Sequence, residues 1–155
     1  MENGKQKTVF RSIVVGGLIF AVGIVVFLNL RTNNGPYMQG VFNFQNVSVS
    51  VDIVRTEAEM AKGLGDRRSL PEGRGMFFEF PVLGPWPIWM KDMYFPIDII
   101  WLDQKMKVVS LKENATPESF PEIFRSEQNS LYVLEVPAGF VRKWGLTVGE
   151  SGFLK

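Results

Sequence analysis

Two acidic residues stand alone in apolar stretches of this chain. Asp98 is the only charged residue of segment 96–102, and Glu135 is the only one of segment 131–136. A carboxylate inside an apolar strand is costly unless a cation or hydrogen-bond donors meet it. Arg67 and Lys91 are the natural donors, and an arginine can offer two parallel N–H groups to a carboxylate. We therefore expect these four side chains to form one polar cluster.

Such a cluster has three interpretations that the residues leave open. It is a structural ion-pair network that pins the segment around Arg67 to a sheet. Such networks perturb the pKa values of their members as functional sites do, so this interpretation fits the same residues. It is a polar patch in a ligand-binding cleft. Or its two carboxyl groups are catalytic, as in glycoside hydrolases, where they face one cleft about 5–9.5 Å apart.

Aromatic side chains gather around Lys91. Three of the four tryptophans fall between residues 86 and 101, at Trp86, Trp89 and Trp101. They either stack against a sugar or another planar ligand, or they fill the core. Met76, Met90 and Met93 either capture a soft metal ion or fill the core. We expect them to fill the core, and we expect neither a metal nor a cofactor. The expected ligand surface is therefore the segment from Trp89 to Lys91.

Composition excludes several classes of chemistry. Histidine and cysteine are both absent from the 155 residues. Ser-His-Asp and Cys-His catalysis, Cys/His zinc sites and disulfides are therefore excluded. The net charge is +1, and acidic side chains outnumber basic ones beyond residue 40. Nucleic-acid binding needs a clustered basic surface, so we expect no nucleic-acid partner.

The N-terminal part of the chain carries a membrane-anchor pattern. Residues 12–30 contain no charged side chain and would span about 28 Å as a helix, enough for a bilayer core. Basic side chains precede this run, at Lys5, Lys7 and Arg11. The positive-inside rule then places the N-terminus in the cytoplasm and the remaining chain outside. A signal peptide is the alternative, but its apolar region is about 7–15 residues and ends at a small-x-small site, which is missing here.

The rest of the chain predicts a mainly β fold, a jelly-roll-like sandwich or barrel. Alternation and apolar runs predict strands at Val47–Val54, Met76–Phe80, Ile88–Met93, Ile97–Leu102, Lys107–Leu111 and Leu131–Val136, followed by a short last strand. Asp52 is expected on the exposed side of the first strand, and Pro81 is expected to end the second. Short helices are expected from a Thr56/Glu59 capping box to about Leu64 and over Ala138–Trp144. No βαβ spacing supports a parallel sheet. Residues 112–130 are predicted to form a folded-back flap.

Several motifs make residues 47–150 resemble the domain of unknown function 192 family of bacteria and archaea. They are Gly63-Leu64-x-x-Arg67-x-Ser69-Leu70-Pro71, Gly75-Met76-Phe77-Phe78-x-Phe80, Trp89-Met90-Lys91, Pro96-Ile97-Asp98-Ile99 and Val133-Leu134-Glu135-x-Pro137-Ala138-Gly139. Asp92 departs from this pattern, because the family often has Asn there. The resemblance implies a compact, β-rich, jelly-roll-like domain that is often exported or membrane-anchored. It implies no activity.

We therefore expect four parts: a cytoplasmic N-terminus (1–11), a transmembrane anchor (12–30), a linker (31–46) and an extracytoplasmic β-rich domain (47–155). Anchored in the cell membrane by a single pass, this domain would bind a small or envelope-derived ligand, or a partner protein, near Trp89 and Lys91. Two alternatives stay open. One is a carboxylate-dependent hydrolase acting on cell-envelope glycan, and the other is a structural interaction module with an exposed apolar patch instead of a pocket.

Overall fold

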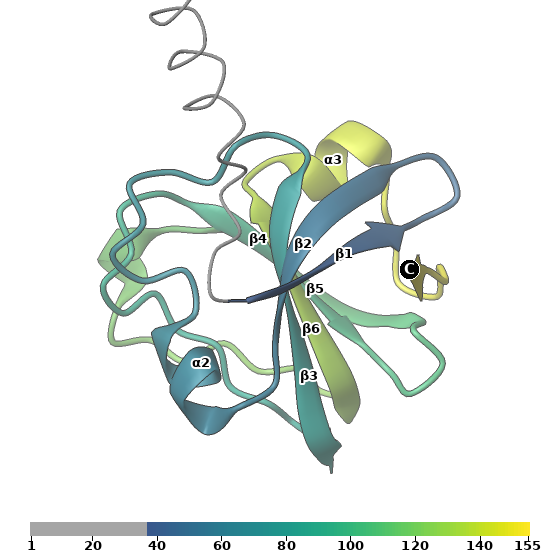
Figure 1. The fold of residues 1–155 in the computed structure, drawn as a ribbon, viewed down its shortest axis with the longest axis horizontal. Helices are drawn as coiled ribbons and strands as arrows, with labels where there is room; N and C mark the ends of the chain where they lie inside the picture. Colours follow the sequence, from purple (N-terminus) through teal and green to yellow (C-terminus); the bar gives the residue numbers. More distant parts are fainter. Residues whose placement is uncertain (1–36) are drawn as a thin grey trace, which may run out of the picture. The chain divides into compact units, whose positions relative to one another are not determined.

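A computed structural model describes residues 37–155, which form a mainly β fold with short helices. Its elements are β1 (Met38–Asn43), β2 (Ser48–Val54), α2 (Glu57–Lys62), β3 (Arg74–Gly84), β4 (Ile97–Leu102), β5 (Val108–Ala115), the 3-10 helix η1 (Pro117–Ser119), β6 (Ser130–Pro137), α3 (Phe140–Trp144) and β7 (Phe153–Leu154). The seven strands make one sheet in the order β5-β4-β6-β3-β2-β1-β7 (Figure 1). The fold is therefore a single curled sheet, whereas a sandwich would need two.

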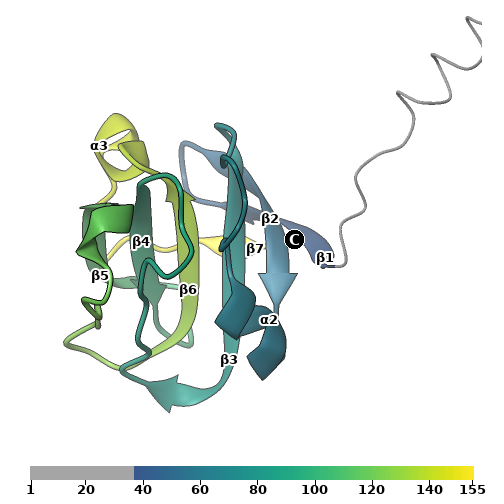
Figure 2. The ribbon, with the colours of Figure 1, turned by 90° about the vertical axis from the view of Figure 1, so that its left-hand side faces the viewer.

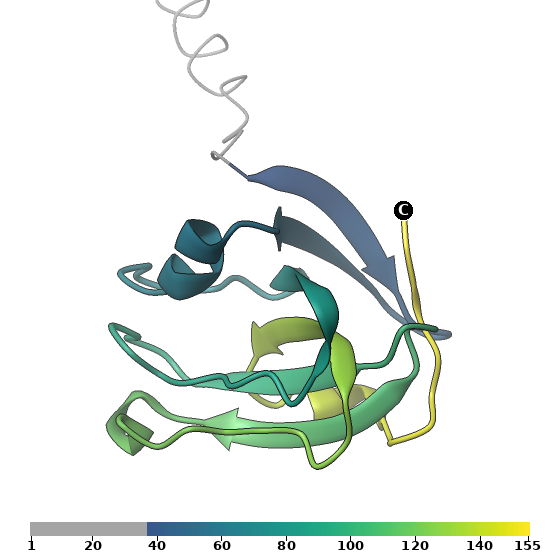
Figure 3. The same cartoon turned by 90° about the horizontal axis from the view of Figure 1, so that it is seen from below.

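The sheet curls into a half-barrel. Figure 3 shows the blue strands at one end of the sheet lying across from the green strands at the other end. Neighbouring strands are antiparallel except β2 and β3, which run parallel and pair from Ser50↔Arg74 to Val54↔Phe78. The connection between these two strands carries α2. The sheet is therefore mainly antiparallel, as the missing βαβ spacing indicated, but it contains one parallel pair that the sequence did not predict.

Both faces of the sheet are covered, because the central strands are apolar on both sides. Ile97, Ile99 and Trp101 of β4 belong to one core, and Ile100 and Leu102 belong to another. We call these faces the α2 face and the α3 face, after the helix that contributes to each core. Figures 1 and 2 show the two helices near opposite ends of the strands. Segment 86–95 also packs on the α2 face, so this side of the sheet carries a second layer built from loops.

The helix caps follow the sequence. Thr56 accepts a hydrogen bond from the Glu59 backbone N–H, and the Glu59 side chain accepts one from the Thr56 backbone, which completes the predicted capping box. Gly63 ends α2 at φ +48°, a backbone conformation that favours glycine. Gly145 ends α3 as predicted, but α3 begins at Phe140, because β6 continues to Pro137.

The structure corrects four predictions about the elements. Segment 88–93 is not a strand and pairs only through an isolated bridge between Ile88 and Phe124. Strand β3 continues past Pro81 to Gly84. Its pairing with β6 is irregular between Glu79 and Gly84, the stretch in which Pro81 has no N–H to donate. Strand β1 (Met38–Asn43) lies within the segment expected to be a linker. The flap of residues 112–130 folds back through Phe124, but its other apolar groups, Phe120 and Ile123, stay exposed.

The predicted anchor over residues 12–30 lies outside the described residues. Between residues 37 and 155, no helix combines the length and the apolar character needed to cross a bilayer.

Candidate functional site

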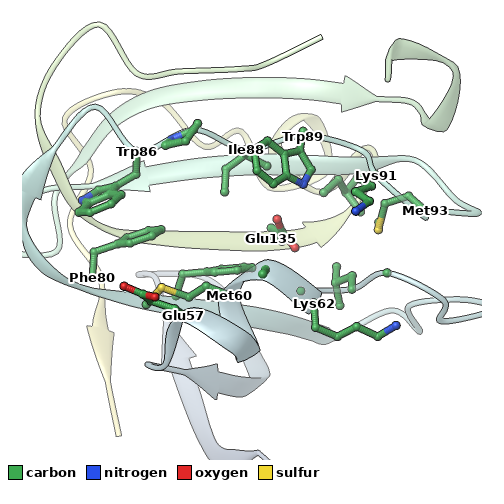
Figure 4. Close-up of a pocket in the computed structure, with 17 residues that line it drawn as sticks. Glu57, Met60, Lys62, Phe80, Trp86, Ile88, Trp89, Lys91, Met93 and Glu135 are labelled. Carbon is green, nitrogen blue, oxygen red and sulfur yellow. The ribbon is translucent and has the colours of Figure 1, made fainter. Parts of the chain in front are cut away.

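A cavity of about 270 Å³ lies on the α2 face of the sheet. Its walls come from α2, from β3 and from segment 86–93, and β6 supplies its floor (Figure 4). The lining residues are Glu57, Met60, Ala61, Lys62, Gly63, Leu64, Gly65, Phe78, Phe80, Trp86, Pro87, Ile88, Trp89, Lys91, Met93, Ile97 and Glu135. Most of these side chains are apolar, so the cavity is suited to an apolar ligand body with few polar groups.

One wall is a fixed aromatic surface. The rings of Phe80 and Trp86 stack with centroids 4.2 Å apart and planes inclined by 7°. The Trp86 indole N–H donates to the Val82 carbonyl at 2.9 Å, and the Trp101 indole N–H donates to the Trp86 carbonyl at 3.1 Å. These bonds fix both ends of Trp86. The wall is therefore already formed in the free protein and needs little ordering when a ligand binds.

Glu135 is the polar group at the floor. Its position in β6 is opposite Met76 on β3 and Ile99 on β4, so it lies between two apolar neighbours. The residue is 5% exposed, and its carboxyl accepts no hydrogen bond from any residue between 37 and 155. Figure 4 shows this carboxyl among the lining side chains, directed into the cavity. Burial raises its pKa to about 8, although the positive charge of Arg67 acts in the opposite direction.

Three charged side chains stand around the cavity at its exposed side. Lys62 forms an i,i+4 ion pair with Asp66, whereas Lys91 and Glu57 have no ion-pair partner among residues 37–155. The Asp66 backbone N–H donates to the Asp92 carbonyl at 2.8 Å and ties the end of the α2 segment to segment 86–93. The two halves of the cavity rim are therefore linked through backbone.

Arg67 pairs with Asp52 instead of with the predicted partners. Its guanidinium lies 2.7 Å from the Asp52 carboxylate, and Arg74 binds the same carboxylate at 3.0 Å. Gln39 donates to it at 2.6 Å. Asp52 is buried, and its expected place on an exposed face is wrong because the side chains of Arg67, Arg74 and Gln39 lie against its carboxylate. The ion-pair network that pins the segment around Arg67 to the sheet exists, but it is built on Asp52.

Asp98 lies on the other side of the sheet from Glu135. In the antiparallel pairing of β4 with β6, Glu135 is opposite Ile99, while Asp98 is opposite Val136. Side chains alternate between faces, so the two carboxyl groups point in opposite directions. Asp98 is 0% exposed and accepts backbone N–H groups from Asn114 at 2.8 Å and Val141 at 2.9 Å. The expected four-residue cluster is therefore wrong, and these two acids cannot form a hydrolase pair.

The structure brings three of the five predicted site residues to one place. Trp89, Lys91 and Glu135 line the cavity, while Arg67 and Asp98 do not. Sequence reasoning missed the contribution of Phe78 and Phe80, although alternation along β3 puts both on the same face. Within residues 37–155, no group of three or more Asp, Glu, His or Cys residues gathers closely enough to hold a metal ion.

Comparisons with known proteins give a family and a fold. The family model of domain of unknown function 192, described as Uncharacterized ACR, matches residues 41–151. A search of the curated proteins finds no match. The crystal structure of a provisionally assigned transcription regulator from Sinorhizobium meliloti 1021 is similar, with a TM-score of 0.74 and 26% identity over 78% of this chain and 97% of that one. A protein of unknown function from Novosphingobium aromaticivorans DSM 12444 is also similar, with a TM-score of 0.69 and 24% identity over 79% of this chain and 89% of that one. This second similarity shows a shared fold alone.

Proposed function

Because this chain belongs to the domain of unknown function 192 family, whose description names no activity, we propose its function from the cavity itself: it binds a small amphipathic molecule there. The apolar body of that molecule lies against the Phe80–Trp86 wall, and its one polar end meets Glu135. The observation that carries this proposal is a buried carboxyl that faces an aromatic cavity and has no hydrogen-bond or ion-pair partner among residues 37–155.

The size of the cavity sets the size of the ligand. An apolar cavity of about 150 Å³ is large enough for benzene. A cavity of about 270 Å³ therefore accepts one ring with a short chain, or a branched hydrocarbon of similar bulk. Drug-sized ligands occupy about 300–1,000 Å³, so the proposed ligand is small.

The energetics of Glu135 favour a site over a purely structural role. A polar group withdrawn from water without a partner costs up to about 1–3 kcal/mol. The Glu135 carboxyl is not fully enclosed, because its oxygens reach the cavity. Asp52 and Asp98, the other buried acids of the described domain, each have protein partners that offset this cost. Glu135 is left to be satisfied by water or by a ligand. A structural interaction module would not need such a group, nor would it need the cavity in front of it.

We keep the membrane anchor and the extracytoplasmic location as part of the proposal. Their support is the uncharged run of residues 12–30 and the basic residues ahead of it. Protease added to intact spheroplasts is expected to destroy the domain. A domain that survives this treatment would contradict the location, and a mature N-terminus near residue 31 would contradict the anchor alone.

Two tryptophans of similar exposure allow a direct test of the cavity. Trp89 lines the cavity and is 43% exposed, while Trp144 on α3 is 39% exposed and lies outside it. We expect Trp89→Ala to weaken the binding of 2-phenylethanol, a ring with a short polar chain, by about 5-fold or more through lost apolar contact. Trp144→Ala is expected to leave it unchanged. Calorimetric titration of the full chain measures both.

Equal affinities in the two variants would place the ligand elsewhere. If 2-phenylethanol and related ring compounds did not bind the wild-type chain at millimolar concentration, the proposed function would be wrong.

A further inference from the structure

The polar end of the ligand can be assigned a chemical class, an inference that rests on the proposed binding function. We propose that the cavity selects organic ammonium compounds, in which a protonated amine on a ring or short hydrocarbon body pairs with Glu135. The geometry that supports this is a single carboxyl at the floor of a cavity whose walls present aromatic faces.

The walls suit a cation. The faces of aromatic rings carry negative electrostatic potential and attract ammonium groups, most strongly when the site is shielded from water. Phe78, Phe80, Trp86 and Trp89 all line the cavity. An ammonium group at the floor would therefore meet a carboxyl and ring faces together, whereas an alcohol would gain one neutral hydrogen bond.

The fixed charges around Glu135 allow a cation to enter. On α2, Lys62 is paired with Asp66, while Glu57 has no ion-pair partner within the described residues 37–155. The same holds for Lys91 on the opposite wall. These unpaired charges are opposite in sign and balance each other at the rim. The strands that flank Glu135 place the uncharged Met76 and Ile99 beside it.

Arg67 is the remaining cation near Glu135, and it is engaged elsewhere. Its guanidinium is held on the Asp52 carboxylate, whose second partner is Arg74. In the part of the chain that the structure describes, no cation therefore forms an ion pair with Glu135. A ligand ammonium would supply one, and the charge-assisted hydrogen bond that forms is shorter and stronger than a neutral one.

The proton balance of this step gives a distinct signature. The Glu135 carboxyl is protonated at neutral pH in the free protein, because its pKa is about 8. When a protonated amine binds, the carboxyl loses its proton to solvent and the ammonium keeps its own. Binding therefore releases close to one proton for each amine. An alcohol of the same shape leaves the carboxyl protonated and releases none.

Calorimetry of the full chain at about pH 6.5, in two buffers of different ionisation enthalpy, measures both affinity and proton release. The probes are 2-phenylethylamine, 2-phenylethanol and 3-phenylpropionate, which share a ring and a short chain. We expect the amine to bind about 10-fold more tightly than the alcohol and to release close to one proton. Glu135→Gln is expected to remove this preference, so that amine and alcohol bind within about twofold. Glu127→Gln, at an exposed position outside the cavity, is the matched control and is expected to keep it.

Three results would overturn this inference. Alcohol binding as tight as amine binding, or a preference that survives in Glu135→Gln, would show that Glu135 does not select the ligand. Tighter binding of 3-phenylpropionate would assign the polar end to an anion held by Lys91. In each of these cases the binding of a small amphipathic molecule in the cavity stands, and only the assignment of its polar end changes. Absence of binding by all three probes would overturn the proposed function and this inference with it. Proton release is measured on the wild-type chain, so the test does not depend on the folding of the variant.

Discussion

Replacing Glu135 with Gln keeps the shape of the buried side chain and removes its ionisation. The wild-type residue is 5% exposed and its pKa is raised from 4.5 to about 8 by burial. In the unfolded chain the same carboxyl ionises near its ordinary pKa. Between pH 4.5 and 8 the unfolded state therefore holds fewer protons at this position than the folded state, so the stability of the wild type falls as the pH rises.

The size of this loss follows from the two pKa values. The folded and unfolded values differ by about 3.5 pH units, and each unit corresponds to about 1.4 kcal/mol. The full loss is therefore about 5 kcal/mol, reached above pH 8. Because whole domains are stable by only about 5–15 kcal/mol, a single carboxyl should dominate the pH dependence of this fold in the neutral range. Glu135→Gln carries no such loss.

Urea unfolding at several pH values between about 4 and 9 measures the difference in unfolding free energy between Glu135→Gln and the wild type. We expect this difference to be small below pH 4.5, to rise by about 1.4 kcal/mol per pH unit, and to level off above pH 8 in favour of the variant. Glu127→Gln, exposed on the flap, should show no comparable rise. A difference that is flat with pH, or that favours the wild type at pH 8.5, would refute the account of a buried, unpartnered carboxyl.

Two further predictions concern the buried acids outside the cavity. Asp98→Ala leaves the buried backbone N–H of Val141 and the part-buried backbone N–H of Asn114 without acceptors and should lower the unfolding free energy by about 2–5 kcal/mol. Asp103→Ala also removes an acceptor for two backbone N–H groups, but in a partly exposed turn, and should cost less; equal losses would contradict the burial argument. In a double-mutant cycle, Arg67→Met and Asp52→Asn should couple by about 1–3 kcal/mol because the two side chains form an ion pair. Arg67→Met and Asp98→Asn should be additive, and coupling of that second pair would contradict the assigned partners.

Alternation along a strand predicted the faces of the sheet well. The sequence places Asp98 with Ile100 and Leu102, and Glu135 with Val133, and the structure confirms both groupings. Alternation does not determine how two strands are aligned, however. A shift of one residue between β4 and β6 decides whether two side chains share a face. The observed register separates the two acids, and this information lies in long-range pairing that no local pattern contains.

The partner of Arg67 was missed for a related reason. Its pairing with Asp52 depends on the parallel pairing of β2 with β3. This pairing places Arg74 opposite Ser50, on the same face as Asp52, and the segment that carries Arg67 connects the two strands. That pairing joins strands through a helix of only six residues, α2. Local signals did predict the parts of this connection, including the capping box at Thr56. They could not predict that its two strands would be neighbours.

The residues of the cavity could be predicted from the sequence, but the cavity itself could not. The sequence singled out Trp89, Lys91 and Glu135 one by one, from their residue types and their apolar surroundings. The cavity lies between α2 and segment 86–93, which are not adjacent in sequence and which are linked by the hydrogen bond from the Asp66 backbone N–H to the Asp92 carbonyl. Such a space between loops has no sequence signature, because it is defined by the residues that do not fill it.

The most direct test of the central claim is to locate a bound ligand within the domain. Met60 and Met93 line the cavity, whereas Met106 packs on the α3 face. In a spectrum of the full chain labelled with 13C-methyl methionine, titration with 2-phenylethylamine is predicted to shift the methyl resonances of Met60 and Met93 in a saturable manner and to leave that of Met106 in place. Saturable binding that shifts Met106 and leaves Met60 and Met93 unmoved would contradict the cavity as the ligand site.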